Sequence, residues 1–127
     1  MASALPEVIT RYLDAYNRID IPSMLLTMTD DICFQHFNGE YCQVSTTDKA
    51  QFQTLAEHSA ELFSSREQII HEVTYVGEAI QLKIRFRGIM AVEFPNLGLP
   101  VGGELRAEGI SEIHLRDGLI CKIIDRN

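Results

Sequence analysis

Two polar side chains in the first third of the chain have the chemistry that proton transfer requires. Tyr12 lies in an apolar pattern typical of a helix, and its hydroxyl can donate a hydrogen bond to an oxygen that gains negative charge during a reaction. His36 ends a short alternating stretch typical of a strand, and an imidazole exchanges protons near neutral pH. Together they would suit proton transfer next to a carbonyl or an acid–base elimination. The alternative is structural: Tyr12 packed in the core with its hydroxyl hydrogen-bonded, and His36 partly buried at a strand end.

Other familiar sites have no pattern here. No HxH or HExxH spacing occurs, so the sequence indicates no metal site. No serine stands in a GxSxG context. The glycines between residues 98 and 103 flank an expected hairpin loop and not a helix start, which argues against a phosphate-binding loop. We therefore expect neither a metal ion nor another cofactor.

The first half of the chain is predicted to be helical. Apolar residues from Leu5 to Tyr16 recur at i, i+3 and i+4 spacing, so Tyr16 shares the face of Tyr12, whereas Asp14 is expected to face solvent. Asp20 is a good N-cap for a short second helix. A strand over residues 32–36 and a turn at 38–39 should follow. A third helix, capped by residue 46 or 47, is expected to run through about residue 65.

The second half is predicted to be strands, over residues 69–76, 79–94, 103–115 and 119–124. Asp117-Gly118 predicts a tight hairpin between the last two. If the two long strands pair across the loop 95–100, Lys83, Arg85 and Arg87 lie opposite a face rich in Glu108 and Glu112. We interpret this face as solvated, with a homodimer interface as the alternative.

Helices first and strands after predict an α+β fold of one domain over residues 1–127. Three N-terminal helices should pack in the concave face of a curved, mostly antiparallel sheet, leaving an apolar pocket. Whether that pocket is open, or filled by residues 86, 90 and 94, stays open at this point. The residues expected to line it, besides Tyr12 and His36, are Tyr16, Phe34, Phe86, Met90 and Ser111.

Composition argues against two classes of partner and suggests a compartment. A net charge of −7 and a pI of about 5.0 argue against binding to nucleic acid or to an anionic membrane surface. The three cysteines are widely spaced, which is typical of reduced thiols. The sequence has no secretory-signal pattern and no apolar stretch of the roughly 20 residues needed to span a membrane. We therefore expect a cytoplasmic protein.

Several stretches resemble a known group. The run from Val8 to Asp20, followed by the run from Asp30 to His36, is similar to the opening of the nuclear transport factor 2-like superfamily, which includes ketosteroid isomerases and SnoaL-like polyketide cyclases. Arg87-Gly88, the stretch 100–103 and the hairpin 116–120 resemble later motifs of SnoaL-like proteins. The resemblance covers nearly the whole chain. It implies the α+β fold described above and, by analogy, a homodimer formed through the sheet face.

The resemblance also implies roles for single residues. Tyr12 falls on the tyrosine that polarises the substrate carbonyl in ketosteroid isomerase, and His36 on the carboxylate that shuttles the proton. The region of the second oxyanion donor holds Ile110 or Ser111, depending on a one-residue gap. The stretch 88–90 lacks the histidine of SnoaL-like cyclases. Asp125 lies near the family's C-terminal acid.

Two functions follow from the sequence. The first is a SnoaL-like isomerase, cyclase or hydrolase that acts without a cofactor on a small hydrophobic ligand bearing a carbonyl or hydroxyl group. The second is a non-catalytic module of the same fold that binds such a ligand or dimerises. A protein–protein adaptor is a third interpretation, and it predicts a large exposed apolar patch.

Overall fold

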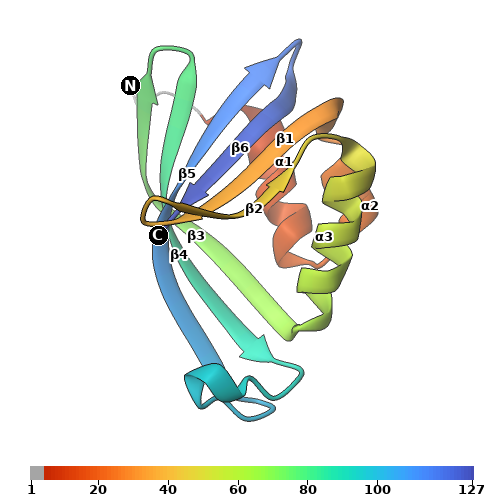
Figure 1. The fold of residues 1–127 in the computed structure, drawn as a ribbon. Helices are drawn as coiled ribbons and strands as arrows, with labels where there is room; N and C mark the ends of the chain where they lie inside the picture. The colour runs from red at the N-terminus through yellow and green to blue at the C-terminus, as the bar shows by residue number, and fades with distance from the viewer. Residues whose placement is uncertain (1–4) are drawn as a thin grey trace.

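The computed structural model describes residues 5–127 as an α+β fold. Three helices and one six-stranded sheet make up its main elements (Figure 1). In chain order they are α1 (Glu7–Asn17), α2 (Ile21–Leu25), β1 (Met28–Asn38), β2 (Tyr41–Thr46), α3 (Lys49–Glu61), β3 (Phe63–Val76), β4 (Ala79–Met90), the 3-10 turn η1 (Pro95–Leu97), β5 (Glu104–Arg116) and β6 (Leu119–Arg126). The sheet order is β2-β1-β6-β5-β4-β3, and β1 and β6 form its one parallel pair. A curved, mostly antiparallel sheet is therefore confirmed.

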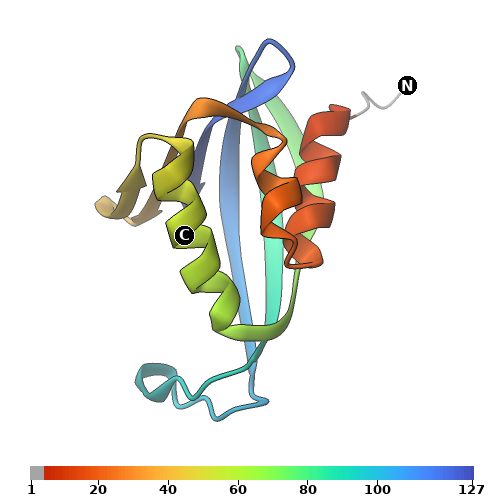
Figure 2. The same cartoon turned by 90° about the vertical axis from the view of Figure 1, so that its right-hand side faces the viewer.

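The helices lie on one face of the sheet (Figure 2). Their apolar sides meet residues of β1, β4, β5 and β6 that point to the same face, and together they form the main core cluster. Ile9, Ile32, Leu82 and Ile120 are completely buried within it. At about 25 cal/mol per Å² of apolar surface removed from water, this burial is the main stabilising contribution. None of the helices within residues 5–127 is long and apolar enough to cross a membrane.

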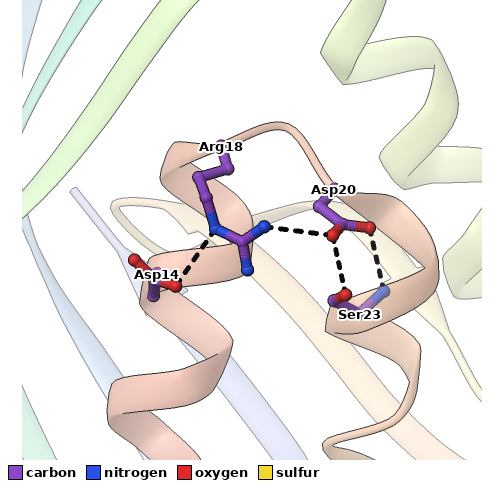
Figure 3. Close-up of polar contacts among 4 residues, drawn as sticks. All are labelled: Asp14, Arg18, Asp20 and Ser23. Carbon is purple, nitrogen blue, oxygen red and sulfur yellow. Dashed lines mark hydrogen bonds and ion pairs between the residues drawn. The ribbon is translucent and has the colours of Figure 1, made fainter.

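The corner between α1 and α2 is held by a polar network (Figure 3). Asp20 is the N-cap of α2, as predicted, and accepts hydrogen bonds from the backbone N–H of Ser23 at 3.2 Å and from its hydroxyl at 2.7 Å. Arg18 joins Asp20 to Asp14 through ion pairs of 3.2 and 3.1 Å. Asp14 therefore points to solvent, also as predicted. The network therefore stabilises the turn that joins the two helices.

The boundaries of helix α3 and strand β3 differ from the predicted ones. The cap is Asp48, whose side chain accepts from the Gln51 N–H at 2.8 Å, and not residue 46 or 47. The helix ends at Glu61 and not near residue 65, because the chain from Phe63 onward pairs with β4. The strand therefore begins six residues earlier than expected. Pairing with a neighbour, which local sequence does not reveal, decides this boundary.

Strand β2 was not predicted, and β1 is longer than expected. The turn at Gly39, with φ of 61°, is confirmed, but residues on both sides of it continue as a hairpin. Most of β2 is exposed and lies at the sheet edge, so it carries little alternation of polar and apolar residues. In contrast, β4 ends at Met90 and not at residue 94, because the chain there enters the loop containing η1.

The long strands β4 and β5 pair as predicted, with Arg85 opposite Glu108. Those two side chains form an ion pair of 3.6 Å. Lys83 instead pairs with Glu72 of β3 at 3.5 Å, and Glu112 lies beside His114 at 2.7 Å. The expected ladder thus forms only in part, because Lys83 stands opposite the apolar Ile110 of β5 and opposite Glu72 of β3. Exposed pairs of this kind contribute about 0–1 kcal/mol each.

Candidate functional site

A cavity of about 280 Å³ lies between the helices and the concave face of the sheet. Its size is close to the lower end of the range of roughly 300–1,000 Å³ typical of small-molecule sites. The predicted site residues that line it are Tyr12, Tyr16, Phe34, His36, Phe86 and Ser111. Met90 is a correction: it is 1 % exposed, but it lies at the far end of β4, outside both the lining and the main core cluster.

Three polar residues form a row across neighbouring strands of the cavity floor. His36 of β1 stands beside Asp125 of β6, and Asp125 stands beside Ser111 of β5. Adjacent strands are about 4.8 Å apart, so side chains on the same face of such a row are immediate neighbours. All three line the cavity. The row arises from the strand order, in which residues 36, 111 and 125 reach one level of the sheet.

Asp125 is the acidic centre of this row. Its side chain is half-buried, and its exposed part lines the cavity. The Ser111 hydroxyl donates a hydrogen bond to one of its carboxylate oxygens. Burial raises the pKa of Asp125 above its usual range, while the Ser111 hydrogen bond and the nearby His36 act in the opposite direction. A carboxyl group whose pKa moves toward neutrality is suited to exchanging protons.

Tyr12 reaches the cavity from α1 and remains protonated. It is 6 % exposed, and burial, followed by the Asp125 charge and by Tyr16, raises its pKa well above the ordinary value, against a smaller opposite effect of Arg66. The Tyr16 ring lies 6.4 Å from the Tyr12 ring, one helical turn away. A protonated tyrosine in such a place can donate a hydrogen bond to a ligand oxygen.

Arg66 is a lining residue that the sequence analysis missed. It lies on the inward face of β3, is 5 % exposed, and donates from Nε to the backbone carbonyl oxygen of Tyr16 at 2.9 Å. Its guanidinium carbon lies 3.7 Å from the centroid of the Tyr16 ring. The predicted boundaries left residue 66 between a helix and a strand. Extending the alternation of Ile70 backwards through Gln68 would have placed Arg66 on the inward face.

Asp125 was mentioned only through the family resemblance and was not among the predicted catalytic residues. The last strand was expected to end at residue 124, but β6 continues through Arg126. The signal was present, because Asp125 is two residues beyond the buried Ile123 and so shares its face. A strand ending in a charged residue near the end of the sequence hides this periodicity.

The rest of the cavity wall is mainly apolar. Phe34 and Phe52 meet edge to face, with ring centroids 5.6 Å apart, and Ile84 and Phe86 extend the apolar surface along β4. Such a site can hold a small apolar molecule and present its oxygen and acidic carbon atoms to Tyr12 and Asp125. In the part of the chain that the structure describes, no three His, Cys, Asp or Glu side chains gather in a way that could hold a metal ion.

Solved structures of similar fold share these features of architecture. A candidate polyketide cyclase from Xanthomonas campestris pv. campestris has a TM-score of 0.76 and 20 % identity, covering 95 % of this chain and 87 % of that one. A hypothetical protein from Catenulispora acidiphila with a ketosteroid isomerase-like fold, in complex with trimethylamine, has a TM-score of 0.74 and 12 % identity, covering 96 % and 85 %. An uncharacterised cystatin-fold protein from Novosphingobium aromaticivorans has a TM-score of 0.73 and 15 % identity, covering 94 % of both chains.

These identities establish the fold and no activity. A sequence comparison with curated proteins gave no match. The SnoaL-like domain family, however, matches residues 9–123, which span α1 to β6 and include Tyr12, His36 and Ser111. The chain therefore belongs to the SnoaL-like domain family.

Proposed function

We propose that this chain binds a small apolar molecule bearing a carbonyl or hydroxyl group and moves a proton on it, as an isomerase or cyclase that needs no cofactor. The observation that carries the proposal is the row of His36, Asp125 and Ser111 in an apolar cavity, with Tyr12 near enough to Asp125 for the carboxylate to raise its pKa. A hydrogen-bond donor and a proton acceptor in one apolar site are what enolisation requires.

In the proposed reaction, the Tyr12 hydroxyl donates a hydrogen bond to the ligand carbonyl oxygen. Asp125 takes a proton from the neighbouring carbon, and the electrons of that C–H bond form a carbon–carbon double bond while the oxygen gains negative charge. Return of the proton to another carbon gives an isomer. Attack of the same carbon on a second carbonyl of the molecule gives a ring. His36, beside Asp125, offers a second position for the proton and opposes the carboxylate charge when it is protonated.

The test is hydrogen–deuterium exchange in D₂O, followed by NMR on a panel of apolar ketones such as 2-tetralone and 2-methylcyclohexanone. We expect the wild-type chain to accelerate exchange next to the carbonyl. Tyr12→Phe, His36→Ala and Asp125→Asn should each slow the catalysed exchange by about 10²–10⁴-fold, the usual contribution of general acid–base groups. Their melting temperatures should stay near the wild-type value. Asp14→Asn, on the exposed side of α1, is the matched control and should leave the rate unchanged.

A second candidate function is ligand binding without catalysis. It is favoured by the Ser111 hydrogen bond, because that bond already occupies one carboxylate oxygen of Asp125, the proposed proton acceptor. If the ketones bind, as seen in saturation-transfer NMR, but exchange no faster than in buffer, the enzymatic proposal fails and the binding module remains. If His36→Ala unfolds the chain, His36 is structural.

We also propose that two copies associate through the outer face of the sheet. Ile69 and Ile110 are exposed there by 47 and 38 %, beside the Arg85–Glu108 ion pair. Apolar side chains surrounded by charged ones match the usual arrangement of an interface, an apolar centre with a polar rim. Light scattering checks this proposal: a mass near 14.4 kDa at all concentrations would contradict it.

A further inference from the structure

Arg66 is a buried cation without an acidic partner. Its side chain lines the cavity and is almost inaccessible to bulk water, with 5 % of its surface exposed. Within residues 5–127, every ion pair of the structure involves other residues, so no carboxylate lies within ion-pairing distance of its guanidinium. Arginine is almost never buried unless it is paired, because moving an uncompensated charge out of water costs several kcal/mol.

The groups that do contact Arg66 are neutral. Its Nε donates to the Tyr16 carbonyl oxygen at 2.9 Å, and its Nη2 lies 3.8 Å from the sulfur of Met24. The Tyr16 ring covers one face of the guanidinium. Burial raises the pKa values of both Tyr12 and Tyr16, so neither phenol supplies a negative charge. A guanidinium has five N–H groups, and these contacts use only two of the three nitrogens.

Asp125 is not the missing counter-ion, because it occupies a different level of the sheet. Arg66 stands opposite Gly88 of β4. Asp125 stands beside Ser111, and Ser111 is opposite Leu82, which precedes Gly88 by six residues in β4. At about 3.4 Å per strand residue, the two backbone positions are roughly 20 Å apart along the sheet. The cavity therefore has a cationic region at Arg66 and an acidic region at Asp125. Both charges act on the pKa of Tyr12, which Asp125 raises and Arg66 lowers.

We propose that Arg66 binds the carboxylate of the ligand, so that the natural ligand is an apolar carboxylic acid whose carbonyl or hydroxyl group lies nearer Tyr12 and Asp125. This inference rests on the proposed function, since it names the class of molecule that occupies the same cavity. Guanidinium and carboxylate match in shape and charge, and the pair is strong where water is excluded. The same contact orients the ligand, because its anionic end is attracted to Arg66 and repelled by Asp125.

The test compares two probes that share one ring system, the carboxylate 2-naphthoate and the neutral ketone 2-acetylnaphthalene. Isothermal titration calorimetry measures both affinities without a fluorescent or absorbing label. We expect wild type to bind 2-naphthoate at least tenfold more tightly than the ketone. Arg66→Met should weaken 2-naphthoate binding about 10- to 100-fold, as expected for loss of a charged hydrogen bond, and leave the ketone affinity within about twofold. Arg66→Lys should bind 2-naphthoate with an affinity between those of wild type and Arg66→Met.

Two controls separate binding from folding. Arg85→Met removes an exposed arginine of the outer face and should change neither affinity. If Arg66→Met does not fold, the Arg66 Nε–Hε signal of wild type answers the question, because it should shift on titration with 2-naphthoate and stay in place with the ketone. Equal affinity for both probes in wild type, or an unmoved Nε–Hε signal, overturns the carboxylate proposal alone. Failure of both probes to bind overturns it together with the ligand-binding function.

Discussion

Replacing Ser111 with alanine tests the electrostatics of the cavity most directly. The change removes the hydroxyl that donates to Asp125 and leaves that carboxyl group facing the cavity without it. Hydrogen bonds to charged groups contribute about 1.5–3 kcal/mol, and those between neutral groups about 0.5–1.5 kcal/mol. We therefore expect Ser111→Ala to lower the free energy of unfolding by about 1.5–3 kcal/mol where Asp125 is ionised, and by about 0.5–1.5 kcal/mol where it is protonated.

The sign of the pH dependence follows from the raised pKa of Asp125. Between its unfolded and folded pKa values, the folded chain binds more protons than the unfolded chain, so this group's effect on stability becomes less favourable as pH rises through that window. The Ser111 hydrogen bond lowers the folded pKa. Removing it extends the window upward, and the stability of Ser111→Ala should fall more steeply with rising pH than that of wild type.

The assay is urea denaturation of both proteins at several values from about pH 4 to about pH 9, within the range where the linear extrapolation holds. A double-mutant cycle with Asp125→Asn isolates the pair, because the amide cannot ionise. In the Asp125→Asn background, Ser111→Ala should cost about 0.5–1.5 kcal/mol at every pH. The reasoning is refuted if the loss in the wild-type background is the same at all pH values, or if the cycle shows no coupling.

Two other substitutions probe how the framework of the cavity is built. A Cβ added at Gly88 would lie 2.6 Å from the Phe63 ring, which packs edge-on against Phe86, so Gly88→Ala should cost about 1–3 kcal/mol in urea denaturation. The cost should shrink in a Phe63→Leu background, and an unchanged cost would mean that the contact with this ring is not its cause. Asp20→Ala removes the cap of α2, and since the Ser23 hydrogen bonds lower the pKa of Asp20, the stability it adds is present above its unfolded pKa and lost as pH falls through the folded one. Relative to wild type, the drop in melting temperature caused by Asp20→Ala should therefore shrink from neutral to acidic pH more than the drop caused by Asp14→Ala. Equal changes of the two drops with pH would contradict this account.

Elements with a strong local signal could be predicted from the sequence alone. The apolar spacing of α1, the Asp20 cap, the alternation of β4 and the Asp-Gly turn before β6 are properties of neighbouring residues, and the structure agrees with each. The α+β class follows from their order along the chain. The same periodicities placed Tyr12 and Phe86 on inward faces. Local patterns succeed here because each of these segments buries one face against the core.

The composition of the site depended on pairing between distant segments. His36, Ser111 and Asp125 become neighbours only because β6 inserts between β1 and β5, and the parallel pairing of β1 with β6 has no local signature. Arg66 enters the cavity because pairing with β4 extends β3 back to Phe63, against the helical tendency expected there. The sequence determined which faces are apolar. Strand order and register, set by long-range backbone hydrogen bonds and by how the helices cover the sheet, decided which charged groups share the cavity.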